Sequence, residues 1–205
     1  FHYVTALGMV TLLLFVDFNT ISPGANDNLT GTYAAVCALR MLDMAGIDFE
    51  NTEVCAMITD GEEAGLRGCK QWAKDHYDEY VNSGVETAVL CVDTLADLEY
   101  LRVYNKDMTG TVKNSQQFSQ LVMDSAKDSG HNDLEFSSVY FGSSDAAAFS
   151  QAGITATCLA AMDPKPADYY HNRRDTAEHL VPEAIKTGFD VIISTILNFD
   201  EKGLN

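Results

Sequence analysis

Short apolar runs alternate with longer segments of helical periodicity along most of this chain, and this alternation restricts the possible folds more than any other feature. The helical segments place apolar residues three and four positions apart, as at Tyr33, Val36 and Cys37. Strands that alternate with helices predict a mostly parallel sheet that is covered on both faces. We therefore expect an α/β fold, with three α/β/α layers around a central, mostly parallel mixed sheet.

The apolar runs predict strands at residues 9–17, 53–59, 87–92, 98–104, 138–141 and 155–160. Helices are expected at residues 29–45, 66–80, 118–129, 145–152 and 182–198, the last with Pro182 in its first turn. No linker or internal repeat divides the 205 residues, so 1–205 should form a single domain. The first residues give no clear start to a domain, and we expect upstream elements to be missing.

The formal net charge of -17 narrows the classes of partner. Nucleic-acid affinity comes from Lys and Arg that neutralise phosphates, so no nucleic acid is expected. The apolar run 4–16 is too short to span a bilayer and lacks the flanks of a signal peptide, so no membrane partner is expected. Five scattered cysteines favour reduced thiols and a cytoplasmic location, with secretion as the alternative.

Acidic residues gather where predicted strands end or helices begin. They are Asp17, Asp27, Asp60, Glu62, Glu63 and Asp93. In open α/β sheets, ligands bind beyond the carboxyl ends of the strands. Carboxylates that converge on one rim repel each other unless a cation or protons intervene. The sequence therefore predicts a metal site at this rim.

The turn "TDGEEAGLRG" (59–68) carries two adjacent carboxylates, Glu62 and Glu63. One could bind a metal while the other takes a proton from metal-bound water, a division of labour that suits hydrolysis. Taken alone, the pair is more simply explained as a solvated acidic turn, because exposed acids are common.

The loop "YYHNRRDT" (169–176) offers His171 as a metal ligand and Tyr170 as a hydrogen-bond donor to an oxyanion. A surface histidine and a packed aromatic are the ordinary alternatives. Asp145 in "SSDAAAF" is explained by helix capping, and the alternative is that it holds the His171 ring from behind.

Five motifs occur in one order over almost the whole chain: "SPGANDNLTG", "TDGEEAGLRG", "CVDTL", "GSSDAAAF…GI" and "YYHNRRDT". Together they resemble the zinc aminopeptidases of peptidase family M twenty-eight, which include bacterial leucyl aminopeptidases and the related glutaminyl cyclases. The resemblance implies that 1–205 form a single zinc-exopeptidase-like catalytic domain that acts on peptides.

The resemblance also implies roles for individual residues. Asp27 would bridge two zinc ions, with Glu63 and His171 as ligands of one ion and Asp93 as a ligand of the other. Glu62 would be the general base that activates a metal-bound water, and Tyr170 would steady the tetrahedral intermediate.

The chain departs from the family pattern just before the Asp27 turn. The family carries a His-x-Asp there, and this chain has Phe15, Val16 and Asp17. Asp17 keeps the aspartate that supports the ligand, but phenylalanine cannot bind zinc. His2 could replace the missing ligand only if it could satisfy the tight geometry of a zinc site. We expect one firmly bound zinc and a weakened second position.

Three hypotheses follow. The first is a metal-dependent aminopeptidase, the second a mononuclear glutaminyl-cyclase-like enzyme, and the third a degenerate member that binds peptides or partners without catalysis. A sheet edge left free by missing upstream strands would also permit a homodimer.

Overall fold

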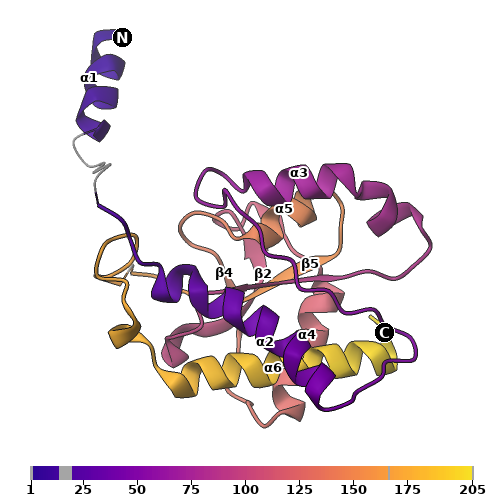
Figure 1. Cartoon of the computed structure of the whole chain (residues 1–205). Helices are drawn as coiled ribbons and strands as arrows, with labels where there is room; N and C mark the ends of the chain where they lie inside the picture. The colour runs from indigo at the N-terminus through magenta and orange to yellow at the C-terminus, as the bar shows by residue number, and fades with distance from the viewer. Residues whose placement is uncertain (1, 14–19, 166, 205) are drawn as a thin grey trace.

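The structure is a computed structural model that describes residues 2–13, 20–165 and 167–204. The helices are α1 (His2–Leu13), α2 (Gly31–Met44), α3 (Arg67–Asp75), α4 (Gln116–Asp128), α5 (Asp145–Gln151) and α6 (Pro182–Lys202). The strands are β1 (Val89–Asp93), β2 (Leu101–Asp107), β3 (Val112–Lys113), β4 (Phe136–Ser138) and β5 (Ala156–Ala161). Figure 1 shows the sheet between a layer with α3 and α5 and a layer with α2, α4 and α6.

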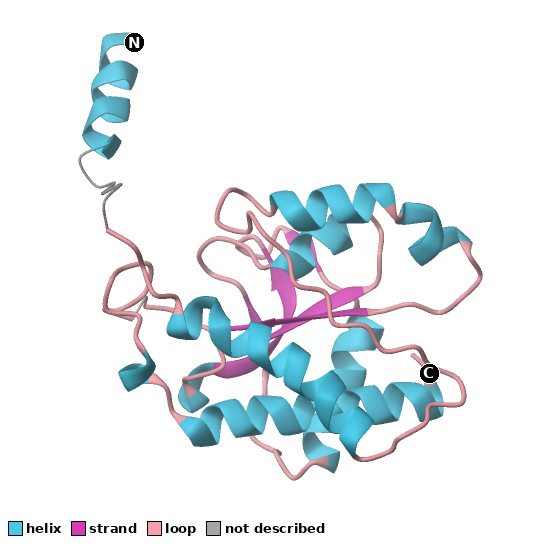
Figure 2. Ribbon diagram, viewed as in Figure 1, coloured by secondary structure: helices cyan, strands magenta, loops and turns pink. Residues whose placement is uncertain are grey.

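The strands form one mixed sheet in the order β1-β5-β2-β3, and β4 also pairs with β2 (Figure 2). β1–β5 and β2–β4 are parallel pairs, whereas β2 pairs antiparallel with β3 and β5. β5 is buried along its whole length, and β1 is only half-buried. The predicted α/β class and mixed sheet are confirmed.

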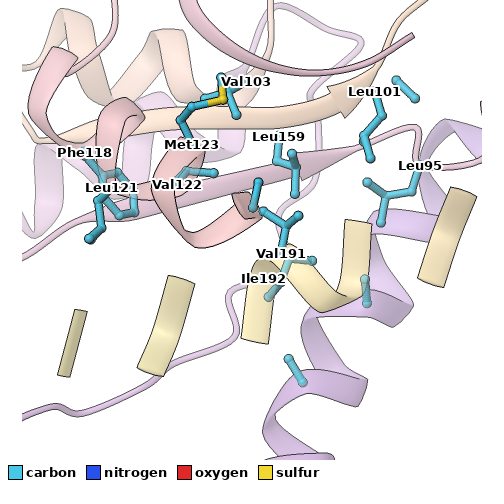
Figure 3. Packing of buried hydrophobic residues seen from close by; sticks show 14 residues of the cluster. Leu95, Leu101, Val103, Phe118, Leu121, Val122, Met123, Leu159, Val191 and Ile192 are labelled. Atoms are coloured by element: carbon cyan, nitrogen blue, oxygen red, sulfur yellow. The ribbon is translucent and has the colours of Figure 1, made fainter. Parts of the chain in front are cut away.

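Two apolar cores lie on opposite faces of the sheet. Alternate residues of β2 and β5 face α4 and α6, where Val103 and Leu159 pack against Val122 and Val191 (Figure 3). The other residues of these strands pack against α3 and α5, around Phe149. The alternation of side chains along a strand accounts for both cores.

Most predicted elements are present. The helix predicted at 66–80 is divided into α3 and a short helical turn, Asp78–Asn82. The strand predicted at 98–104 begins with the turn Leu98–Tyr100 and continues as β2. The strand predicted at 138–141 instead runs as β4, Phe136–Ser138.

Two strand predictions in the first third of the chain differ from the structure. Residues 53–59 run without strand pairing to a described neighbour. Residues 9–13 belong to helix α1, and the remainder of the predicted strand 9–17 lies outside the described residues. A strand needs a partner for its backbone groups, and residues 53–59 lack one among the residues that the structure describes.

Helix α1 extends away from the body of the molecule in Figure 1. Those of its side chains that the structure describes are exposed, with Tyr3 at 92% and Met9 at 66% of full accessibility. Within the described residues, no helix combines the length and apolarity that crossing a membrane requires.

Candidate metal centre

The turn that presents Asp27 is fastened to the end of β1 by asparagine side chains. Asn28 donates from Nδ2 to the carbonyl oxygen of Val92 (3.0 Å), and its Oδ1 accepts from the N–H of Thr94 (3.2 Å). Asn26 is buried, and its Oδ1 accepts from the N–H of Ala96 (3.0 Å). These bonds hold the Asp27 turn against the loop that follows β1.

Gly31 permits this close approach. A Cβ atom added at this position would lie 2.3 Å from the carbonyl oxygen of Val92, which no side chain could tolerate. The glycine at the start of α2 therefore brings the Asp27 turn and the end of β1 together.

Asp175 holds the backbone of the same turn from the other side. Its Oδ1 accepts from the N–H of Asn26 (2.9 Å), and its Oδ2 accepts from the N–H of Asp27 (3.0 Å). Asp175 is buried and lies four positions after His171, so one loop fixes the Asp27 backbone and supplies the imidazole. Sequence reasoning missed this residue, although it lies inside the recognised motif "YYHNRRDT".

Three predicted ligands come together around the imidazole of His171. Its Nε2 lies 3.1 Å from Oδ2 of Asp27 and 2.9 Å from Oε1 of Glu63. One ligand atom from each residue lies within 4.8 Å of the other two. His171 has a left-handed backbone with φ of 56°. We call this set the ligand trio.

Glu62 and Glu63 lie in the turn before α3. The turn is closed by the N–H groups of Gly65 (2.9 Å) and Leu66 (2.8 Å), which donate to the carbonyl oxygen of Glu62. Burial and the neighbouring carboxylate of Glu63 raise the pKa of Glu62 to about 7. Burial also raises the pKa of Glu63, although His171 opposes this change.

Asp93 lies at the end of β1, as predicted, but it is not part of the ligand trio. Its Oδ1 is shielded from solvent and has no hydrogen-bond partner among the described residues. Burial, followed by the charge of Asp27, raises the pKa of Asp93 well above its usual range. The negative charge beside the trio is therefore not neutralised by the protein itself.

The Tyr170 ring stacks on the His171 ring, with centroids 3.8 Å apart and planes inclined by 20°. Burial, with the charges of Asp27, Asp93 and the two glutamates, raises the pKa of Tyr170. The hydroxyl therefore stays protonated and lies close to the acidic cluster.

Asp145 differs from its predicted supporting role. Its Oδ2 accepts a hydrogen bond from Thr59 (2.8 Å), whereas His171 contacts Asp27 and Glu63. Asp145 is close enough to Glu62 to raise its pKa, and its buried Oδ1 has no partner within the described part of the chain. Phe15, Asp17 and the side chain of His2 lie outside the part of the chain that the structure describes.

The chemistry of these residues fits a divalent metal. Two carboxylates and an imidazole are a normal zinc ligand set, and three protein ligands leave a position open for catalysis. The unpartnered Oδ1 of Asp93 and the raised pKa values of the neighbouring acids indicate a site that a cation would stabilise.

Comparison with known proteins identifies the class. The model of Peptidase family M28 matches residues 10–196, so the chain belongs to this family. The family resemblance inferred from the five motifs is confirmed.

Individual relatives agree with this assignment. The chain is similar to aminopeptidase YwaD of Bacillus subtilis, with 28% identity over 88% of the chain and 38% of that protein. Among solved structures it is similar to the LapA aminopeptidase of Legionella pneumophila, with a TM-score of 0.71 and 17% identity over 88% of the chain and 48% of LapA. It is also similar to BSAP, a zinc aminopeptidase from Bacillus subtilis, with a TM-score of 0.63 and 24% identity over 85% of the chain and 42% of BSAP. The chain therefore spans less than half the length of these relatives.

Proposed function

We propose that this chain carries the catalytic centre of a metal-dependent aminopeptidase that removes N-terminal residues from peptides. The observation that carries the proposal is the convergence of Asp27, Glu63 and His171 on one small volume, with the carboxylate of Glu62 beside them.

Asp27, Glu63 and His171 would hold a zinc ion through two carboxylate oxygens and one imidazole nitrogen. Bound zinc supplies Lewis acidity, which polarises a carbonyl and lowers the pKa of water. Asp93 would contribute to a second, weaker position that it shares with Asp27.

Glu62 is suited to the role of general base. A carboxylate beside the ligand trio can accept a proton from water and also return it. The carboxylate of Glu62 would accept a proton from the attacking water. It would then pass this proton to the amine nitrogen that leaves when the peptide bond breaks.

Tyr170 and Asp93 would act on opposite charges of the substrate. The protonated Tyr170 hydroxyl can donate to the oxyanion that forms at the scissile carbonyl. Asp93 and its neighbouring acids would hold the free ammonium of the peptide, whose positive charge relieves the repulsion that raises the pKa of Asp93, and this would make the enzyme an exopeptidase. We also propose a cytoplasmic location from the scattered cysteines.

Turnover assays with purified protein test this function. Zinc should bind at one firmly held ion per chain, and leucine anilide should release leucine when zinc is present. Ring closure of an N-terminal glutamine with release of ammonia would instead identify a cyclase. Zinc binding without either reaction would leave a non-catalytic peptide-binding protein.

A further inference from the structure

Asp175 binds three consecutive residues of the Asp27 turn. Its main-chain carbonyl oxygen accepts from the N–H of Ala25 (3.2 Å). Its two carboxylate oxygens accept from the N–H groups of Asn26 (2.9 Å) and Asp27 (3.0 Å). Asp175 is only 1% exposed, so water does not compete for these bonds. One residue therefore fixes the backbone from which the Asp27 side chain projects.

The segment from His171 to Asp175 is short and is bonded within itself. Asn172 donates from Nδ2 to the carbonyl oxygens of Asp168 (2.9 Å) and Tyr170 (3.1 Å). The main-chain carbonyl oxygen of Asn172 accepts from the N–H of Asp175 (3.1 Å). This bonding leaves little freedom between His171 and Asp175, so a displacement of Asp175 would also displace the imidazole.

Asp175 therefore joins the two loops that supply two of the three members of the ligand trio. Zinc holds nitrogen and oxygen ligands at about 2.0–2.2 Å, so two tetrahedral ligand atoms lie about 3.3 Å apart. Nε2 of His171 and Oδ2 of Asp27 are 3.1 Å apart in the protein without metal. The hydrogen bonds of Asp175 thus coincide with a ligand spacing close to the one that zinc requires.

We propose that Asp175 is a positioning residue for the metal, which holds Asp27 and His171 at the spacing of zinc ligands and thereby sets the zinc affinity of the trio. Loss of a residue that orients metal ligands typically weakens metal binding by about 10- to 100-fold. The inference rests on zinc binding by the trio, as in the proposed function, but it does not depend on catalysis.

The same coupling acts in the opposite direction. If the hydrogen bonds of Asp175 strengthen zinc binding, then bound zinc strengthens these bonds by the same free energy. The amides of Asn26 and Asp27 donate to the Asp175 carboxylate, and their hydrogen exchange should slow by about 10- to 100-fold when zinc is added.

Zinc titration of the full 205-residue chain tests the proposal, with a chromogenic chelator as competitor. Asp175→Asn should raise the Kd for zinc by about 10- to 100-fold, because an amide has one acceptor oxygen and places its NH₂ group against the second N–H donor. Asp107→Asn is the matched control, since Asp107 is equally buried and accepts from three donors outside the trio. It should leave the Kd for zinc unchanged.

Cobalt in place of zinc reports the ligand arrangement directly. At saturating cobalt, the visible absorption spectrum of Asp175→Asn should differ from that of the unmodified chain, because the coordination geometry changes. The spectrum of Asp107→Asn should match the unmodified one. A purely structural role of Asp175 would leave the spectrum of the saturated site unchanged.

Three outcomes would overturn the proposal. They are an unchanged zinc Kd in Asp175→Asn, an equal loss in both asparagine variants, and exchange at Asn26 and Asp27 that does not respond to zinc. The exchange measurement uses the unmodified chain, so it decides the question even if Asp175→Asn does not fold. Absence of turnover in a chain that binds zinc would contradict the proposed function and leave this inference standing, whereas absence of zinc binding would refute both.

Discussion

The acidic cluster has two halves, the ligand trio and the region around Asp93. The negative charge of the carboxylates is compensated differently in each half. In the ligand trio, Asp27 and Glu63 face the imidazole of His171, and both Glu63 and His171 are partly exposed to solvent. On the other side, Asp93 has a shielded oxygen without a partner and carboxylates as neighbours. The comparison indicates that the trio presents its three ligand atoms to a cation, whereas the carboxylates around Asp93 repel each other until protons or a cation bind.

The largest effect is expected at Glu62, which interacts electrostatically with members of both halves. Glu62→Gln keeps the size of the side chain but cannot accept a proton. We expect kcat for leucine anilide to fall by about 100- to 10,000-fold, the usual range for loss of a general base. Zinc content should stay unchanged, because Glu62 is not in the trio.

Glu201→Gln on the exposed face of α6 is the matched control and should retain full activity. Full activity in Glu62→Gln would remove Glu62 from the mechanism and leave the ligand trio untouched.

The second prediction compares how much the ligand trio and Asp93 each contribute to zinc affinity. His171→Ala removes the only imidazole of the trio, and we expect the Kd for zinc to rise by more than roughly 100-fold, beyond the effect of losing a supporting residue. Asp93→Asn should still bind one zinc per chain. Competition with a chromogenic chelator measures both values.

His179→Ala is the control for the histidine variant, since His179 stacks on Tyr169 outside the trio. Equal losses of zinc affinity in His171→Ala and Asp93→Asn would mean that the cation sits between the halves instead of in the trio.

Sequence patterns predicted those parts of the fold whose signals are local. Helix α4 begins where Ser115 accepts a hydrogen bond from the N–H of Phe118, and α6 begins at Pro182. The apolar run of β5 is buried throughout and needs no distant information to be read as a strand.

Long-range dependence explains the failures. Residues 9–13 and 53–59 have strand-like sequences, but strand pairing depends on what lies beside them. Asp175 was missed for a similar reason, because its partners Asn26 and Asp27 lie 149 and 148 positions away along the chain. The motifs identified the chemistry of Asp27, Glu63 and His171, and the structure added the residues that hold them in place.

The third prediction concerns pH and the metal-free protein. Glu62 has a pKa of about 7 when folded, against 4.5 in its ordinary state, so the folded state binds the proton more tightly. Its contribution to stability is complete below pH 4.5 and is lost as the pH rises through about 7. The raised pKa of His171 acts in the same direction above its ordinary value of 6.5.

We therefore expect the free energy of unfolding to increase by roughly 1–2 kcal/mol between about pH 7.5 and about pH 5, allowing for solvent screening. Urea denaturation with a chelator present measures this change. Excess zinc should abolish it, because protons then compete with the metal. Stability of the metal-free protein that falls over this interval would contradict the picture of unrelieved repulsion.

The smallest expected effect distinguishes Asp93 from a second buried aspartate. Asp107 is also buried, but its Oδ1 accepts from the N–H groups of Met108 (2.7 Å) and Ser144 (3.1 Å), and its Oδ2 accepts from the Ser144 hydroxyl (2.6 Å). Asp93→Asn should stabilise the metal-free protein by about 1 kcal/mol at neutral pH, because Asp93 is ionised in the unfolded chain and folding buries it among carboxylates that oppose its charge. Asp107→Asn should destabilise the protein, because an amide cannot accept on both sides of the group. Urea denaturation of both variants at one pH measures the change in the free energy of unfolding for each. A change of the same sign in both variants would mean that burial alone, without the neighbouring carboxylates, sets the energy of Asp93.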